Sequence, residues 1–176
     1  MNIFILSLDP VEAAIMQCDK HVVKMLLESC QMLCTVAAQH EFEVPYKPVH
    51  QKHPCTIWVG QSKQNWDWMI THTDALNKEY KRRYNRTHKC EPVLEELKKL
   101  KTELPDIGRT AFAQAMPDIY KDPDPIKAYR AYYLNEKKRF AKWNHSKTPD
   151  WWIGDTNDDQ SERLQSSSVH AERHKR

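Results

Sequence analysis

The chain has 176 residues, an apolar share of 40% and a formal net charge of +3, which suits one domain with its own core and does not by itself indicate a polyanion partner. No run approaches the roughly 18 apolar residues of a membrane span, and the start, MNIFILSLDP, lacks the basic region and cleavage site of a secretory signal. Five cysteines without a C-x-x-C pair fit a reducing compartment, so we expect a cytoplasmic protein with no membrane partner.

Helices are expected to dominate, because the chain has only three glycines against ten prolines and a fold of many tight β-turns needs more glycine. Residues 2–8 (NIFILSL) predict a short extended segment buried against the core. Asp9-Pro10 then starts a long helix, with aspartate as N-cap and proline in the first turn. This helix runs, with or without a kink, to about Gln39, and a loop follows over residues 41–53.

A second helical stretch opens at His53-Pro54 and extends to Tyr84, either as one helix or as two helices with a break near residues 70–73. A third segment begins at Glu91-Pro92 and is ended by Pro105.

After an irregular stretch, Asp124-Pro125 caps a last helix that reaches Trp143. The predicted fold is therefore all-α: a compact single-domain helical bundle over residues 1–152, with a short extended N-terminal segment and long irregular loops. Residues 153–176 are too polar to bury a core and predict a disordered tail.

A polar stripe runs along the first predicted helix. Gln17, His21, Lys24, Glu28 and Gln31 follow one another in steps of three and four residues, which places them on one helix face. The stripe is either the solvent edge of the helix, with Lys24 and Glu28 as an ordinary pair, or a polar groove facing a substrate. In the second interpretation, a partly buried Glu28 beside an imidazole and an amine suits proton transfer or stabilisation of a developing cation.

The loop before the second helix carries His50, His53 and Cys55 with the spacing H-x2-H-x-C. Structural zinc sites need more ligands than these three, and no C-x-x-C or H-E-x-x-H accompanies them, so no metal ligand is assigned. Capping or core roles for His53 and Cys55 are the common alternative. A third interpretation is that Lys47, His50 and His53 contact phosphate, with Tyr46 available for stacking.

Basic and aromatic side chains also interleave near the end of the second helical stretch and on the last helix. Residues 78–89 carry six Lys or Arg against one Glu. Such residues either complement the helix dipole or bind a phosphate backbone with aromatic stacking. The further candidate nucleic-acid contacts are Lys81, Arg82, Arg83, Arg86, Lys89 and Arg130. Two such surfaces favour a nucleic-acid or nucleotide partner over a peptide.

Nucleotide-cofactor templates are absent, since the chain has no GxxxxGK[ST], GxGxxG or GxSxG sequence. We therefore expect no cofactor, and simple ATPase, dehydrogenase and α/β-hydrolase functions are set aside.

Several segments resemble known families. MNIFIL, DPVEAA, CDKHVVKMLLE, YKPVHQKHPCTIWV, FAQAMPDIY and DPIKAYRAYYLNEKKRFAKW resemble an uncharacterised family of phage-encoded proteins, over residues 1–152. The chain also resembles the pyrimidine-dimer DNA glycosylase/AP lyases, a small all-helical group. The resemblance lies in the segment MNIFIL before the first long helix, the loop YKPVHQKHP and the stretch EYKRRY.

The second resemblance implies a phage-type enzyme that removes a damaged or modified pyrimidine base through a Schiff base. The α-amine of the first residue, here Met1, attacks C1′ of the sugar, and a helix-borne glutamate, here Glu28, stabilises the intermediate. His21 and Lys24 are the expected neighbours. An α-amine suits this role because it loses its proton at lower pH than a lysine side chain does. The implied partner is duplex DNA, bound through its phosphates by a monomer in the cytoplasm, or in the host cytoplasm if phage-encoded.

Two other functions fit the same residues, so whether the protein is an enzyme stays open at this stage. One is an enzyme acting on free nucleotides or modified bases with the same His21, Lys24 and Glu28 stripe. The other is a non-catalytic module that binds nucleic acid or a host protein. The catalytic hypothesis requires the first nitrogen of the chain to lie close to Glu28.

Overall fold

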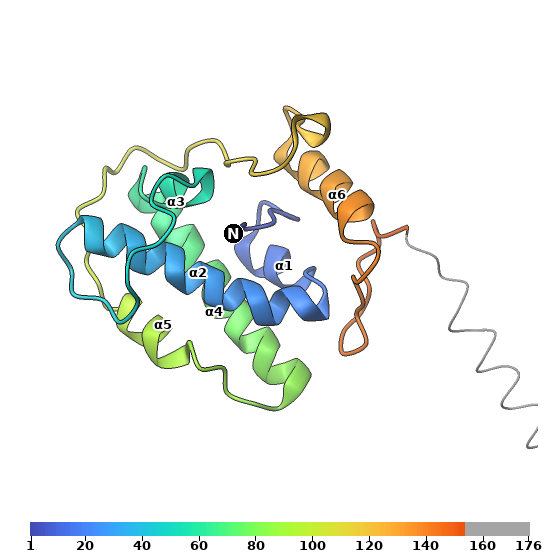
Figure 1. The fold of residues 1–176 in the computed structure, drawn as a ribbon, viewed down its shortest axis with the longest axis horizontal. Helices are drawn as coiled ribbons and strands as arrows, with labels where there is room; N and C mark the ends of the chain where they lie inside the picture. The colour runs from blue at the N-terminus through green and yellow to red at the C-terminus, as the bar shows by residue number, and fades with distance from the viewer. Residues whose placement is uncertain (154–176) are drawn as a thin grey trace, which may run out of the picture.

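The computed structural model describes residues 1–153, and within this range it has helices and no β-strand, which confirms the all-α prediction. In chain order the elements are α1 (Pro10–Ile15), α2 (Asp19–Gln39), α3 (Pro54–Val59), α4 (Lys63–Tyr84), α5 (Glu91–Leu97), the 3-10 helix η1 (Asp118–Tyr120) and α6 (Pro125–Glu136). The long helices α2 and α4 pack against each other, and the shorter helices surround them (Figure 1). None of the described helices is long and apolar enough to cross a membrane. The tail predicted from residue 153 onward lies, apart from Ile153, outside the described residues.

The first predicted helix is in fact two helices, α1 and α2, separated at residues 16–18. Its predicted start is confirmed, because the Asp9 carboxylate accepts hydrogen bonds from the backbone N–H groups of Val11 and Glu12, both at 2.8 Å. At the break, Cys18 adopts an extended backbone with ψ of 162°. The prediction of one continuous helix over this region was therefore wrong.

The second predicted stretch is also two helices, but its break falls at residues 60–62 and not near residues 70–73, which lie inside α4. The new start has its own cap, since the Ser62 hydroxyl accepts from the backbone N–H of Asn65 at 3.1 Å. A serine cap competes effectively with helix continuation, so the chain breaks where that cap is available.

The last helix ends at Glu136, short of the predicted Trp143, although its Asp124 cap is confirmed. The chain leaves α6 in order to return to the start of α2. There the Lys142 carbonyl accepts from the Asp19 N–H at 2.9 Å, and the Trp143 indole donates to the Met16 carbonyl at 3.0 Å. These contacts require a turn that a continued helix would not make.

The N-terminal segment is buried, as predicted, and lies among the helices in the middle of the fold (Figure 1). Because it pairs with no strand, side chains satisfy its carbonyl groups. The Gln17 amide donates to the Ile3 carbonyl at 3.1 Å, and the Arg130 guanidinium donates twice to the Leu6 carbonyl, at 2.9 and 3.1 Å. Aromatic side chains of α6 pack on the same segment through the Phe4 ring.

A buried ionic network joins the end of α4 to the break between α1 and α2. The Arg83 side chain is fully buried and contacts the carboxylates of Glu79, at 2.9 Å, and Asp19, at 3.1 Å. The same guanidinium donates to the carbonyls of Ile15 and Gln17, both at 2.8 Å. These two carbonyls lose their helical partners at the break, so Arg83 supplies the hydrogen bonds that the break removes.

Replacing Arg83 by methionine should destabilise the fold by about 3–5 kcal/mol, because it removes the ion pair of Asp19, one of the two arginine partners of Glu79 and the donor to two carbonyls. Urea unfolding monitored by tryptophan fluorescence measures this cost. Arg86→Met at an exposed position of the same basic stretch is the matched control and should cost almost nothing. Equal stabilities of the two variants would contradict the role given to Arg83.

Two buried histidines are held uncharged in the core. The His21 ring stacks on Phe4 at 4.4 Å between centroids and hydrogen-bonds the Tyr133 hydroxyl at 2.6 Å. Burial lowers the pKa of His21 to about 3. The His72 ring hydrogen-bonds the Pro10 carbonyl at 2.9 Å, and burial lowers the pKa of His72 to about 4. At the pH at which the two histidines of the unfolded chain begin to take up protons, both imidazoles are still neutral in the folded protein.

Stability should therefore be complete above pH 6.5 and fall as the pH drops below that ordinary histidine pKa, because only the unfolded chain then takes up the protons. At pH 5, each buried histidine contributes a loss of up to about 2 kcal/mol. Urea unfolding at pH 7 and pH 5 tests this. The variants His21→Gln and His72→Gln should lose less stability between the two pH values than the parent, whereas His40→Gln, at an exposed site, should match the parent.

Candidate active site

The first nitrogen of the chain lies beside a carboxylate of α2. The Met1 amine is 3.6 Å from Oε2 of Glu28, and the Asn2 N–H donates to the same oxygen at 3.1 Å. The Glu28 side chain keeps 12% of its surface exposed, so the carboxylate is shielded but not sealed. The structure thus brings together the two groups on which the catalytic hypothesis depends.

Lys24 occupies the outer side of the same carboxylate. Its ammonium lies 3.5 Å from Oε1 of Glu28, one helical turn along α2, and its side chain is 68% exposed. The two oxygens of Glu28 therefore have different neighbours: Oε2 faces the chain terminus and Oε1 faces an exposed lysine.

Asn2 anchors the terminus in its place. Its side-chain NH2 donates to the Ala115 carbonyl at 2.7 Å, and its side-chain oxygen accepts from the N–H groups of Ile3, at 2.8 Å, and Phe4, at 3.2 Å. Phe4 has a φ of 56°, in the left-handed region, so the chain turns sharply just after the anchor. The short side chain of Asn2 thus fixes the direction in which Met1 leaves the core.

His53 lies on the other side of the terminus. Its Nδ1 accepts from the backbone N–H of Cys55 at 3.2 Å, which makes it the N-cap of α3 and confirms the capping alternative for this residue. Burial, the nearby α-amine and His50 lower the pKa of His53, although Glu28 opposes that shift. Cys55 is buried, and residues 1–153 contain no group of three or more His, Cys, Asp or Glu side chains placed to hold a metal ion.

The remaining predicted catalytic residue, His21, points elsewhere. Its ring partners are Phe4, Tyr133 and Phe140, all in the aromatic core. The stripe of α2 thus changes in character along the helix: His21 packs inward, while Lys24 and Glu28 face the chain terminus and the solvent. Helical spacing predicted a shared face but not how deeply each end of that face is buried.

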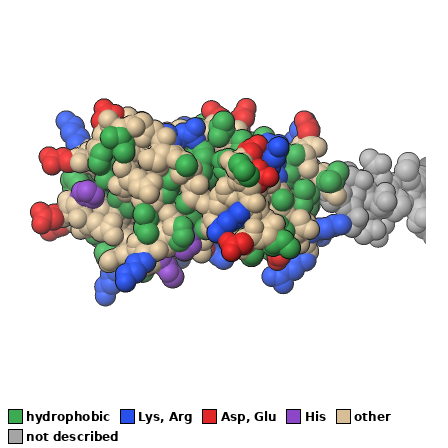
Figure 2. Space-filling view, turned by 90° about the horizontal axis from the view of Figure 1, so that it is seen from above, with side chains coloured by type: hydrophobic (Ala, Val, Ile, Leu, Met, Phe, Trp, Pro, Cys, Tyr) green, Lys and Arg blue, Asp and Glu red, His purple; other side chains and the backbone are tan. Residues whose placement is uncertain are grey.

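The predicted basic contacts divide into occupied and exposed groups. Arg83 and Arg130 are used inside the protein, and the Arg130 guanidinium additionally lies over the Trp151 ring at 5.3 Å. Arg82 makes two hydrogen bonds to Glu79, and Lys81 pairs with Glu91. Lys81 and Arg82 are thus exposed but paired, and the other exposed candidates are Lys47, His50, Arg86 and Lys89. Figure 2 shows basic, acidic and apolar side chains mixed on one face, without a broad basic field.

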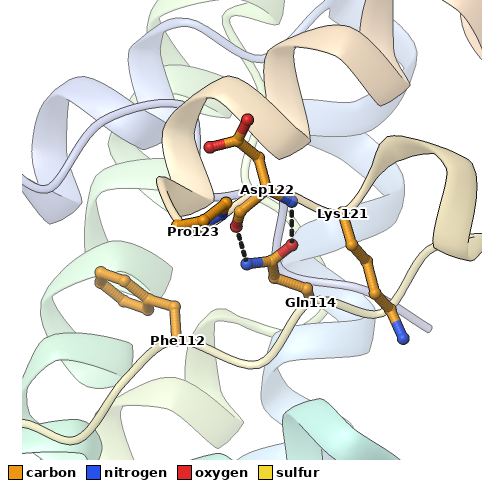
Figure 3. Close-up of a pocket in the computed structure, with 5 residues that line it drawn as sticks. All are labelled: Phe112, Gln114, Lys121, Asp122 and Pro123. Atoms are coloured by element: carbon orange, nitrogen blue, oxygen red, sulfur yellow. Dashed lines mark hydrogen bonds between the residues drawn. The ribbon is translucent and has the colours of Figure 1, made fainter.

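A surface hollow of about 490 Å³ lies next to the loop that anchors Asn2, bordered by Phe112, Gln114 and residues 121–123. The Gln114 amide donates to the Asp122 carbonyl at 2.6 Å and accepts from the Asp122 N–H at 3.2 Å (Figure 3). The polar groups of the Gln114 side chain are therefore already paired, and neither Met1 nor Glu28 borders the hollow.

The family model described as pyrimidine dimer DNA glycosylase matches residues 1–92, more than half of the 176 residues. The chain belongs to this family. Its function is accordingly of the pyrimidine-dimer DNA glycosylase type, in DNA repair, with DNA as its substrate. The matched region contains Met1, Lys24, Glu28 and His53, whereas Ala115 lies outside it. No curated protein and no solved structure matches this chain significantly.

Sequence patterns missed two functional placements in this glycosylase. Asn2 belongs to an apolar-looking segment and gives no periodic signal, and its partner Ala115 lies 113 residues away. His53 comes from a loop and lies near enough to the charged terminus for the α-amine to lower its pKa, and only the motif HP marked that loop in advance.

Proposed function

We propose that the protein is a DNA glycosylase/AP lyase that removes a damaged pyrimidine base from duplex DNA through a Schiff base on the α-amine of Met1. The observation that carries the proposal is the distance of 3.6 Å between that amine and Glu28 in a member of the pyrimidine-dimer glycosylase family. The proposal includes action as a monomer and a phage setting, as the sequence resemblances imply.

The chemistry requires a neutral amine and a stabilised cation. The amine lone pair attacks C1′ of the sugar, and the glycosidic bond breaks with its electron pair going to the base, which takes up a proton. The nitrogen gives up one proton after the N–C1′ bond has formed. The C1′–O4′ bond then breaks with its electron pair staying on O4′, which takes up a proton, while the nitrogen lone pair forms the C=N bond of a protonated, cationic imine. Glu28 is the carboxylate placed to stabilise that cation. Displacing the damaged nucleotide from the stack exposes C1′ to the amine.

The proposal takes Met1 as the first residue of the active protein. Its side chain is only 3% exposed, and the Thr56 hydroxyl contacts its sulfur at 3.7 Å, so this side chain fills a place in the fold. Removal of Met1 would instead leave the Asn2 nitrogen as the terminus, 3.1 Å from Glu28. The intact mass of the active protein distinguishes these two starts.

Borohydride reduction should trap a covalent adduct between the protein and duplex DNA that carries a pyrimidine dimer or an abasic site. Peptide mapping should locate the adduct on Met1. Glu28→Gln should slow trapping by about 100-fold or more, because it removes the charge that faces the developing cation. A glycine added before Met1 should abolish trapping by displacing the amine.

Glu95→Gln is the matched control, since it makes the same chemical change at an exposed position of α5, and it should trap at the parent rate. Absence of any adduct with folded protein and all plausible lesions would end this mechanism. Thermal stabilisation by a mononucleotide without an adduct would favour an enzyme of free nucleotides. Full function in Glu28→Gln would favour a non-catalytic binder.

The exposed basic residues are proposed to hold the phosphate backbone. Lys47→Gln and Arg86→Gln should each reduce the slope of log affinity against log salt by about one, since each removes one phosphate contact. Lys101→Gln, also exposed, is the control and should leave the slope unchanged. Fluorescence anisotropy with labelled duplex between low and moderate salt measures the slopes. Identical slopes for all four proteins would place the DNA elsewhere on the surface.

A further inference from the structure

The outer face of α2 carries two adjacent rows of side chains. Lys24 and Glu28 form one row, one helical turn apart, and Glu28 lies 3.6 Å from the Met1 amine. Val23 and Leu27 form the second row and are 37% and 39% exposed. Residues three or four apart are neighbours on a helix surface, so Leu27 is a neighbour of both Val23 and Lys24. An apolar row therefore adjoins the row that carries the carboxylate of the candidate site.

The core does not account for this apolar row. On its buried side α2 already packs Val22, Met25 and Leu26, each at most 2% exposed. Val23 and Leu27 lie outside that buried stripe, where a surface helix normally carries polar side chains. Single exposed apolar residues are common on protein surfaces, but these two adjoin each other and a candidate reactive group. Their position indicates a ligand that presents apolar groups next to the groups that react.

The candidate site opens toward the same face of α2. The Met1 side chain is 3% exposed and the Asn2 side chain donates to the Ala115 carbonyl, so the side chains of the first two residues point into the protein. Glu28 keeps part of its surface exposed, and Lys24 beside it is largely exposed. A nucleic acid whose sugar meets the amine therefore lies over the outer face of α2, where it also covers the apolar row.

Lys20 extends the cationic part of this face. It is exposed, lies one turn before Lys24, and its ammonium lies over the Phe140 ring at 5.5 Å. From Lys20 to Glu28 the helix rises by about 12 Å at about 1.5 Å per residue. This rise corresponds to about three or four nucleotides of one strand, at about 3.4 Å each. A strand with its damaged nucleotide at Glu28 can thus place a flanking phosphate at Lys20.

We propose that Val23 and Leu27 contact the bases of the duplex at the gap from which the damaged nucleotide is displaced. This inference rests on the proposed function, which requires that displacement. Removing a nucleotide from the stack exposes the apolar faces of the neighbouring bases to water, and apolar side chains that enter the gap cover those faces again. The apolar row thus stabilises DNA with a gap in its stack, whereas Lys20 binds the phosphates of any duplex.

The first test uses DNA that cannot react with the amine. Fluorescence anisotropy compares a labelled duplex that carries a tetrahydrofuran abasic analogue with the intact duplex of the same sequence. The parent should bind the analogue duplex more tightly. Leu27→Ala should lower the ratio of the two affinities about tenfold, as expected when one or two methylene groups lose an apolar contact, and Val23→Ala about threefold. Leu27→Met keeps the apolar volume and the helix propensity and should retain the ratio.

Two matched variants separate this contact from general effects. Leu8→Ala makes the same chemical change at a position that is 51% exposed and lies outside α2, and it should match the parent. Lys20→Gln should weaken the binding of both duplexes by the same factor, because a phosphate contact does not depend on the gap. An unchanged ratio in Leu27→Ala, or an equal loss of affinity for both duplexes in that variant, would overturn the proposal. So would a parent that binds both duplexes equally.

The second test is borohydride trapping at subsaturating DNA. Leu27→Ala should slow trapping about tenfold on a duplex with a pyrimidine dimer, but not on a single strand with an abasic site, which has no continuous stack to fill. Equal slowing on both substrates would contradict the proposed contact. If the parent forms no adduct with any lesion, the Schiff-base function fails, while the affinity ratio still decides whether the apolar row contacts the gap.

Discussion

The structure depends on a buried N-terminal segment that has no strand to pair with. Residues 3–6 are almost completely excluded from solvent, so each of their polar backbone groups needs a partner from elsewhere. Side chains supply these partners: the Gln17 amide for Ile3 and the Arg130 guanidinium for Leu6. Gln17 is itself fully buried because it lies at the break between α1 and α2, where the chain turns toward the segment. The need of the buried segment for polar partners therefore accounts for three features together: the break between α1 and α2, the buried polar side chains and the position of α6.

The burial of this segment also restricts the orientation of the α-amine at the chain terminus. A free chain end in solvent samples many orientations, and an enzyme that uses its α-amine must restrict them before the reaction begins. Here Asn2 anchors the segment to the Ala115 carbonyl, and Glu28 accepts from the N–H of the first peptide group. The position of the amine is thus a product of the fold.

Local signals in the sequence were reliable where the interaction itself is local. The caps at Asp9 and Asp124 were predicted because an N-cap and its partners lie within three residues, and Glu28 was found by helical spacing alone. The errors arose from distant partners. Arg83 supports the break at Gln17 across 66 residues, and Arg130 reaches Leu6 across 124 residues. No periodicity shows such pairs, so both arginines looked like surface charge that was available to DNA.

The residues matched by the family model do not include all the residues that build the site. Residues 1–92 contain the proposed nucleophile and its carboxylate. Yet the Asn2 side chain finds its acceptor at Ala115, and the Leu6 carbonyl finds its donors on α6. Without those later residues, two buried polar groups of the N-terminal segment would lack partners, at a cost of about 1–3 kcal/mol each, and the amine would lose its fixed direction. The groups proposed for catalysis are therefore encoded early in the chain, but their geometry is completed by its second half.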